Sequence, residues 1–136
     1  MFYKKKPTYN KQYWYSMPYS RTKNGTLSDN YGDRKEAWSE SKNGERNPLS
    51  ILSFPRDGKR VHPTQKPVAL LEYLIKTYTN EGETVLDNCM GSGSTGIACL
   101  NTNRKFIGME LNEEYFEMAK ERIDKRMNLE VEKLSI

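Results

Sequence analysis

The chain is 136 residues long, 35% hydrophobic and 29% charged, which allows one domain with a modest core. It contains no run of about 18–20 apolar residues and opens on no signal peptide, so we expect no membrane partner and a cytoplasmic location. One histidine and two cysteines without a CxxC pair argue against a metal site and a disulfide framework.

Positive charge is concentrated in one half of the chain. Residues 1–60 carry 13 Lys and Arg against 6 Asp and Glu and hold 10 of the 15 aromatic residues, whereas residues 61–136 have a net charge of −3. Basic and aromatic side chains together suit a phosphate backbone and stacked bases, so this half is predicted to contact nucleic acid. The alternative is an irregular, solvated surface segment.

The same half shows few signs of regular structure. Residues 2–3 can be the end of a strand. The three lysines and Pro7 that follow would terminate it. Residues 8–60 are dense in Asn, Ser, Gly and Tyr, which predicts loops and short extended pieces. One such piece is 49–54, which alternates partly like a strand and stops at Pro55.

From His62 onward the pattern becomes regular. Pro67 suits the first turn of a helix, and apolar residues follow it at helical spacing. The predicted elements are a helix over 67–79, a strand over 84–87, a helix over 94–101, a strand over 105–109, a helix from Asn112 to about 127 and a frayed or short tail over 128–136. Their order predicts an α/β fold: a βαβ unit with flanking helices and hence part of a parallel sheet.

Three glycines, Gly91, Gly93 and Gly96, follow the first of these strands in the spacing G-x-G-x-x-G. Small residues let a ligand approach the backbone, and a helix start offers N–H groups. Glu110, at the end of the next strand, could chelate two ribose hydroxyls. The pattern therefore predicts a nucleotide site, although a glycine turn that only packs helix on strand has the same pattern.

Asp87, which ends the strand before the loop, decides between two ligand classes. Its carboxylate would repel the pyrophosphate of NAD, and three residues separate it from Gly91, where a dinucleotide site places glycine almost at once. S-adenosyl-L-methionine (SAM) carries an ammonium and a sulfonium and no phosphate. The sequence thus favours SAM, with an NAD-binding oxidoreductase fragment as the weaker alternative.

Three stretches in order resemble the site-specific DNA amino-methyltransferases with circularly ordered motifs. "DNCMGSGSTG" resembles their SAM-binding motif, "HPTQKP" the motif before it, and "FIGMELNEEYFEMAKERI" the strand, acid and helix after it. Asn88 replaces the usual Pro and Ser94 the usual Thr, and both stay small and polar. The resemblance implies a partial Rossmann-like methyltransferase fold and methylation of adenine N6 or cytosine N4 in DNA.

The resemblance also implies the cofactor-binding residues. Asp87 and the loop would hold the methionine end of SAM, Glu110 the ribose, and Lys66 would lie by the methionine carboxylate. The full set is Thr64, Lys66, Asp87, Asn88, Met90, Gly91, Ser92, Gly93, Ser94 and Glu110.

No catalytic D/N/S-P-P-Y/F motif is found in the chain. The nearest string is Ser16-Met17-Pro18-Tyr19, a weak candidate because Met replaces the first Pro and no apolar strand leads into it. The family's aromatic stacks on a flipped base, and its acid or amide accepts from the target amino group. We therefore expect the chain alone to be inactive; the alternatives are a non-catalytic remnant that binds SAM or DNA, or a subunit that needs a second chain.

The resemblance divides the chain into three segments. Residues 1–60 would be a basic, aromatic target-recognition segment, 61–127 the SAM-binding segment and 128–136 a tail. "FYKKKPTYN" resembles the end of the last strand before such a recognition region. The chain then corresponds to the C-terminal part of an enzyme, and we expect DNA as partner together with a second copy, or a complementary chain, that supplies the missing sheet strands.

Overall fold

The computed structural model describes residues 6–23, 37–58 and 62–134. It is mixed α/β with small sheets, and it divides into two compact units. The hairpin unit is Lys11–Ser50, and the α/β unit is Met1–Asn10 with Ile51–Ile136. The strand tail predicted at residues 2–3 lies outside the described residues.

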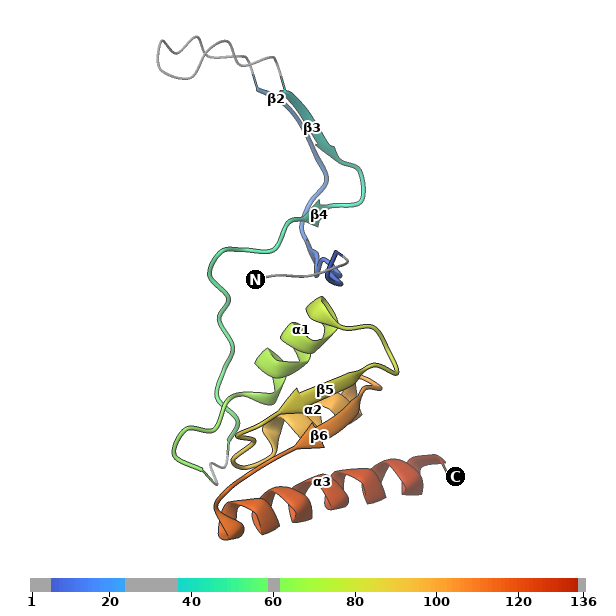
Figure 1. Cartoon of the computed structure of the whole chain (residues 1–136). Helices are drawn as coiled ribbons and strands as arrows, with labels where there is room; N and C mark the ends of the chain where they lie inside the picture. Colours follow the sequence, from blue (N-terminus) through green and yellow to red (C-terminus); the bar gives the residue numbers. More distant parts are fainter. Residues whose placement is uncertain (1–5, 24–36, 59–61, 135–136) are drawn as a thin grey trace. The chain divides into compact units, whose positions relative to one another are not determined.

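The hairpin unit contains two antiparallel strand pairs (Figure 1). In one pair β2 (Tyr19–Lys23) lies against β3 (Ala37–Ser41), and in the other β1 (Trp14–Tyr15) lies against β4 (Glu45–Arg46). The turn before β4 needs Gly44, whose φ is 77° and whose missing Cβ would collide with the backbone carbonyl of Ser16.

The α/β unit has the element order that its sequence predicts. Its elements are α1 (Val68–Tyr78), β5 (Thr84–Asp87), α2 (Ser94–Asn101), β6 (Lys105–Gly108) and α3 (Glu113–Leu134). β5 and β6 pair in parallel, with Thr84 opposite Lys105 and Asp87 opposite Gly108. Because parallel strands end at the same edge, the residues that follow β5 and β6 are brought together there.

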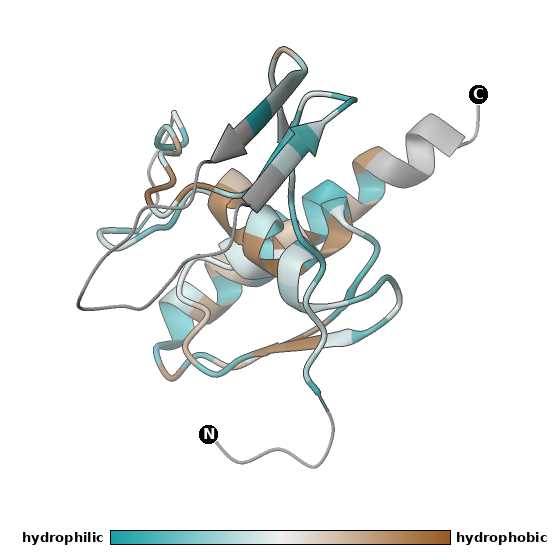
Figure 2. Ribbon diagram, turned by 90° about the horizontal axis from the view of Figure 1, so that it is seen from above, coloured by the Kyte–Doolittle hydropathy of each residue, from teal (hydrophilic) through white to brown (hydrophobic). Residues whose placement is uncertain are grey.

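The core of this unit lies on one face of the sheet. Cys99 and Ile75, from α2 and α1, are buried, and Val85 and Phe106 pack against them from the strands. The helices cluster on this side, and their apolar residues meet where the helices cross (Figures 1 and 2). On the opposite face Leu86 is 60% exposed and Ile107 51% exposed, so within the α/β unit that face is bare.

Both ends of α1 are capped by residues distant in sequence. The Asp57 carboxylate accepts a hydrogen bond from the Val68 N–H at 3.3 Å, where the helix dipole favours an anion. At the other end the Asn10 side chain and the Arg104 guanidinium donate to the Thr79 carbonyl at 3.0 and 2.8 Å. Packing therefore joins the segments around residues 10 and 57 to the α/β unit, while a division of roles at residue 60 stays a prediction.

Two predictions about elements were wrong. α3 continues to Leu134 where an end near residue 127 was expected, because 128–134 contains no Gly or Pro and five of its seven residues are Leu, Glu or Lys, which favour helices. Residues 49–54 form no strand, and Phe54 packs its ring 5.9 Å from that of Tyr73. Every helix within the described ranges is too short or too polar to traverse a lipid bilayer.

Candidate functional site

A pocket of about 300 Å³ opens where β5 and β6 end. Its walls come from the segment before α1, from the glycine loop and from the residue after β6. The lining residues are His62, Thr64, Gln65, Lys66, Leu71, Asp87, Cys89, Met90, Gly91, Ser92, Ser94, Thr95 and Glu110. All of the predicted cofactor-binding residues except Asn88 and Gly93 are among them.

The glycine loop is held in a conformation that side chains rarely allow. Gly91 has φ 51° and Gly93 has φ 73°, both in the left-handed region. A Cβ on Gly93 would stand 2.9 Å from the Cβ of Ala119 in α3. Gly93 therefore supports the loop from behind rather than lining the pocket, which explains its absence from the wall.

Asp87 is held by two donors. The Thr95 hydroxyl donates to its Oδ2 at 2.6 Å, and the Cys89 N–H donates to its Oδ1 at 3.2 Å. The carboxylate is thus fixed at the mouth of the loop. Thr95 is not among the residues predicted from the sequence, although a hydroxyl in the first turn after a glycine loop can reach back to the strand end.

Glu110 ties the loop to the start of α3. Its Oε2 accepts from the Gly91 N–H at 2.9 Å, and its Oε1 accepts from the Asn112 N–H at 3.0 Å. The Asn112 and Gly91 amides lower the pKa of Glu110, so the group is ionised at neutral pH. A carboxylate has about four lone-pair sites, which leaves capacity for further donors such as hydroxyls.

The segment before α1 forms the opposite wall. The His62 ring lies edge-on to the ring of Tyr115, with centroids 4.3 Å apart. His62 Nδ1 accepts from the Thr64 N–H at 3.2 Å, and Lys66 Nζ donates to the Thr64 carbonyl at 3.1 Å. The arrangement brings an ammonium group to a pocket that holds two carboxylates.

The hydroxyls of Ser94, at this pocket, and Ser41, in the hairpin unit, are both buried without a hydrogen-bond partner among the described residues. Ser94 is 5% exposed, and among the described residues its Oγ has no hydrogen-bond partner. A buried hydroxyl without a partner costs free energy unless something else satisfies it. The carboxylates of Asp87 and Glu110 suit a positively charged group, and the ammonium of Lys66 suits a negatively charged one. Together with the Ser94 hydroxyl they fit a polar ligand that carries both a positive and a negative charge.

The weak catalytic candidates lie in the hairpin unit. Ser16 and Pro18 come between β1 and β2, and Tyr19 begins β2, whose partner is antiparallel. The Arg46 guanidinium lies 4.3 Å from the centre of the Tyr19 ring. In the described part of that unit no parallel strand leads into the string, so a catalytic role for it stays a prediction without added support.

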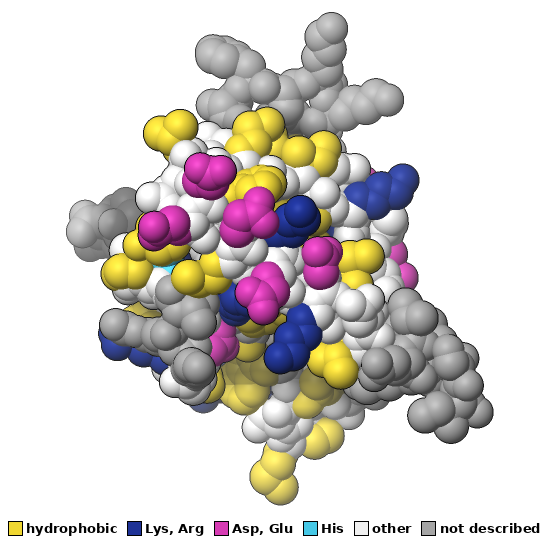
Figure 3. All heavy atoms as spheres, turned by 90° about the horizontal axis from the view of Figure 1, so that it is seen from below, with side chains coloured by type: hydrophobic (Ala, Val, Ile, Leu, Met, Phe, Trp, Pro, Cys, Tyr) yellow, Lys and Arg dark blue, Asp and Glu magenta, His cyan; other side chains and the backbone are white. Residues whose placement is uncertain are grey.

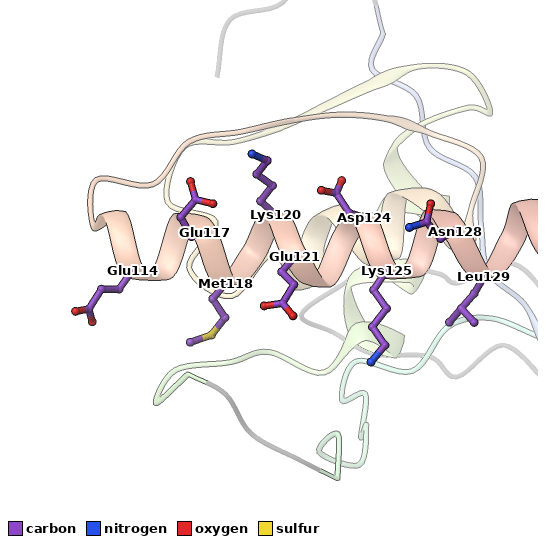
Figure 4. Close-up of a pocket in the computed structure, with 9 residues that line it drawn as sticks. All are labelled: Glu114, Glu117, Met118, Lys120, Glu121, Asp124, Lys125, Asn128 and Leu129. Atoms are coloured by element: carbon purple, nitrogen blue, oxygen red, sulfur yellow. The ribbon is translucent and has the colours of Figure 1, made fainter.

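A larger hollow of about 880 Å³ lies along α3 but has a different character. It is bordered by this one helix, whose labelled side chains point to either side of the helix axis (Figure 4). Acidic and basic side chains alternate over this surface with apolar ones between them (Figure 3). Such mixed charge at helical spacing is typical of a solvated helix face, and we place no site there.

The two cysteines are expected to differ in reactivity. Cys89 is exposed beside the pocket, whereas burial raises the pKa of Cys99 to about 11. Because the thiolate is the reactive form, iodoacetamide at about pH 7.5 should modify Cys89 and spare Cys99. Mass spectrometry of the native protein measures this. Cys89→Ser should then take up no label until denaturant is added, and rapid labelling of that variant would contradict the buried position of Cys99.

Comparison with known proteins gives a consistent result. The sequence model of a family described as DNA methylase matches residues 1–121. Among curated relatives, the Type II methyltransferase M.HpaI of Haemophilus parainfluenzae is 45% identical over 80 residues, covering 59% of this chain and 26% of the relative. The DNA adenine methyltransferase YhdJ of Escherichia coli K12 is 40% identical over 98 residues, which cover 68% of this chain and 33% of that relative. The chain thus spans about a quarter to a third of the length of these relatives.

Among solved structures, the crystal structure of the M1.HpyAVI–SAM complex is 34% identical in sequence to this chain. The match covers 81% of this chain and 62% of the M1.HpyAVI chain, with a TM-score of 0.46.

Proposed function

The chain belongs to the N6/N4 family of DNA methylases, and on that premise we propose that the pocket at the ends of β5 and β6 binds SAM. The observation that carries this is the meeting of Asp87, the glycine loop and Glu110 in one pocket, which Ser94 also lines. The parallel pairing of β5 with β6 around α2 supports a partial Rossmann-like methyltransferase fold.

Each wall then has a role in binding. Asp87 attracts the cationic end of SAM, and residues 90–94, of which Gly93 acts from behind, surround its methionine part. Thr64 and Lys66 stand where the methionine carboxylate needs a positive charge, and Glu110 accepts from ribose hydroxyls. Asn88 does not line the pocket, and its proposed part is limited to the loop conformation.

NAD fits these walls less well. Its pyrophosphate is anionic and would lie between the carboxylates of Asp87 and Glu110. Lys66 is the single Lys or Arg among the pocket-lining residues. Two carboxylates against one ammonium disfavour a doubly charged anion on Coulombic grounds.

The reaction class is methylation of an exocyclic amino group, adenine N6 or cytosine N4. Bound SAM supplies a methyl group on a sulfonium, and this chain's residues bind and orient it. A flipped base also needs acceptors for its amino protons, and we assign none in this chain. The chain by itself is therefore expected to transfer no methyl group to DNA, and the alternative function is binding of SAM or DNA without catalysis.

Calorimetry with S-adenosylhomocysteine (SAH) and with NAD tests the cofactor. We expect SAH to bind and NAD to bind far more weakly, because only SAH lacks phosphate. SAH should also slow the alkylation of Cys89, which borders the pocket. Tighter binding of NAD would overturn the assignment.

We also propose that the hairpin unit contacts DNA. Arg21, Arg46 and Tyr19 border one hollow there, together with Ser20 and Ser39. If two phosphates are neutralised, raising salt from about 50 mM to about 200 mM should weaken binding about tenfold.

Fluorescence anisotropy with a labelled duplex measures that salt dependence. Arg21→Gln should flatten it, and the charge-matched control Lys120→Gln, on α3, should leave it unchanged. Binding that is insensitive to salt, or equal loss in both variants, would contradict a hairpin contact.

The bare face of the β5–β6 sheet supports a further part of the proposal. Parallel sheets are normally covered on both faces, and a two-stranded unit is rarely stable alone. We propose that a second copy, or a complementary chain, covers Leu86 and Ile107.

A further inference from the structure

One stripe of α3 faces the glycine loop. Tyr115, Ala119, Arg122 and Ile123 are spaced i, i+4, i+7 and i+8, which places them on one side of a helix. Ala119 is fully buried and the other three are half-buried. These four side chains pack against the glycine loop and its neighbours from the side of α3.

Members of the stripe contact the glycine loop and the two segments beside it, which are the segment before α1 and the start of α2. Tyr115 holds the ring of His62, which lies 3.6 Å from the position of a Cβ on Gly91. Ala119 closes the space behind Gly93. Ile123 does the same at Gly96, where a Cβ would stand 2.5 Å from its Cδ1. Gly93 in the loop and Gly96 in α2 are thus required by the close approach of α3, because a side chain at either position would collide with it.

Arg122 makes the one polar contact of the stripe with the loop backbone among the described residues. Its guanidinium Nη1 donates to the carbonyl of Ser92, a residue that is almost completely buried. Burial lowers the pKa of Arg122, but a guanidinium stays charged at neutral pH, so the bond is charge-assisted. The N–H groups of the two residues that flank Ser92 are held as well, because the Gly91 N–H donates to Glu110 and the Gly93 N–H donates to the Met90 carbonyl.

We propose that Arg122 is a positioning residue for cofactor binding: by fixing the Ser92 carbonyl it holds the loop in the conformation that forms the pocket wall. This inference rests on the proposed function, because the ligand is taken to be SAM or SAH. Arg122 itself contacts the loop backbone and not the ligand. Its effect passes through the backbone of residues 91–93.

Arg126 provides a matched control on the same helix, one turn further on. Its Nε donates at 2.8 Å to the side chain of Asn101, the last residue of α2. Both arginines are half-buried and both join α3 to another element. They differ in whether the acceptor belongs to the pocket wall.

The experiment compares Arg122→Leu, Arg122→Lys and Arg126→Leu in the full chain. Hydrogen exchange of the amides at 90–94 is measured without ligand, SAH affinity by calorimetry, and the melting temperature by circular dichroism. We expect Arg122→Leu to speed loop exchange and weaken SAH binding about tenfold or more, the effect of losing one charge-assisted hydrogen bond. Arg122→Lys should restore most of both, and Arg126→Leu should change SAH affinity less than about twofold.

Three results overturn the proposal. If Arg122→Leu has the same loop hydrogen exchange and the same SAH affinity as the parent, the bond from Arg122 to Ser92 does not position the loop. Equal losses in Arg122→Leu and Arg126→Leu, in step with their melting temperatures, show general destabilisation. Failure of the parent chain to bind SAH refutes the proposed function and the cofactor role of Arg122 with it. Loop exchange in the ligand-free variants then still decides whether Arg122 orders the loop.

Discussion

Replacing Glu110 with alanine is expected to weaken SAH binding by between about 5-fold and 150-fold, which corresponds to a loss of about 1–3 kcal/mol of binding free energy. Two effects act together. The ribose hydroxyls lose their acceptor, and the N–H groups of Gly91 and Asn112 lose theirs, since both donate to this carboxylate. Calorimetry on the folded variant measures the loss.

Glu110→Gln separates the two effects, because its amide oxygen can still accept from one backbone N–H. We expect it to fall between the parent and Glu110→Ala. Glu117→Ala is the control, since Glu117 is an exposed acid on α3 that borders the other hollow. Unchanged affinity in Glu110→Ala would remove Glu110 from the site, and an equal loss in Glu117→Ala would reduce the effect to overall charge.

Self-association is the second large effect that we expect. At micromolar concentration the chain should sediment as a dimer or as a larger species, because Leu86 and Ile107 leave an apolar face of the sheet open to solvent within the α/β unit. Burying one such side chain stabilises an interface by about 1.5–3 kcal/mol. Sedimentation velocity and light scattering measure the mass directly.

Ile107→Lys should shift the chain toward monomer, since a lysine on that face would be buried without a partner. Leu129→Lys is the matched control: Leu129 is 46% exposed, close to the 51% of Ile107, but it lies on α3. A compact monomer that melts cooperatively would contradict the prediction of self-association. It would mean that residues of the chain's first 60 fold back over the sheet.

The βαβ order could be predicted from the sequence because its signals are local. Helical spacing after Pro67, the run before Asp87 and the glycine spacing each act over a few residues, and the predicted 84–87 and 94–101 coincide with β5 and α2. The candidate pocket was also largely predictable. Parallel strands end at one edge, so Asp87 and Glu110 had to meet there.

The tertiary structure decided the contacts between residues far apart in sequence. The bond from Arg122 to the Ser92 carbonyl joins residues 30 apart, and no local pattern marks it. The Asp57 cap on α1 and the role of Ala119 behind Gly93 likewise depend on how close two elements approach. Sequence periodicity tells which face of α3 is buried. Only packing in three dimensions determines that this face of α3 holds the glycine loop. The same holds for the sheet face that stays bare within the α/β unit.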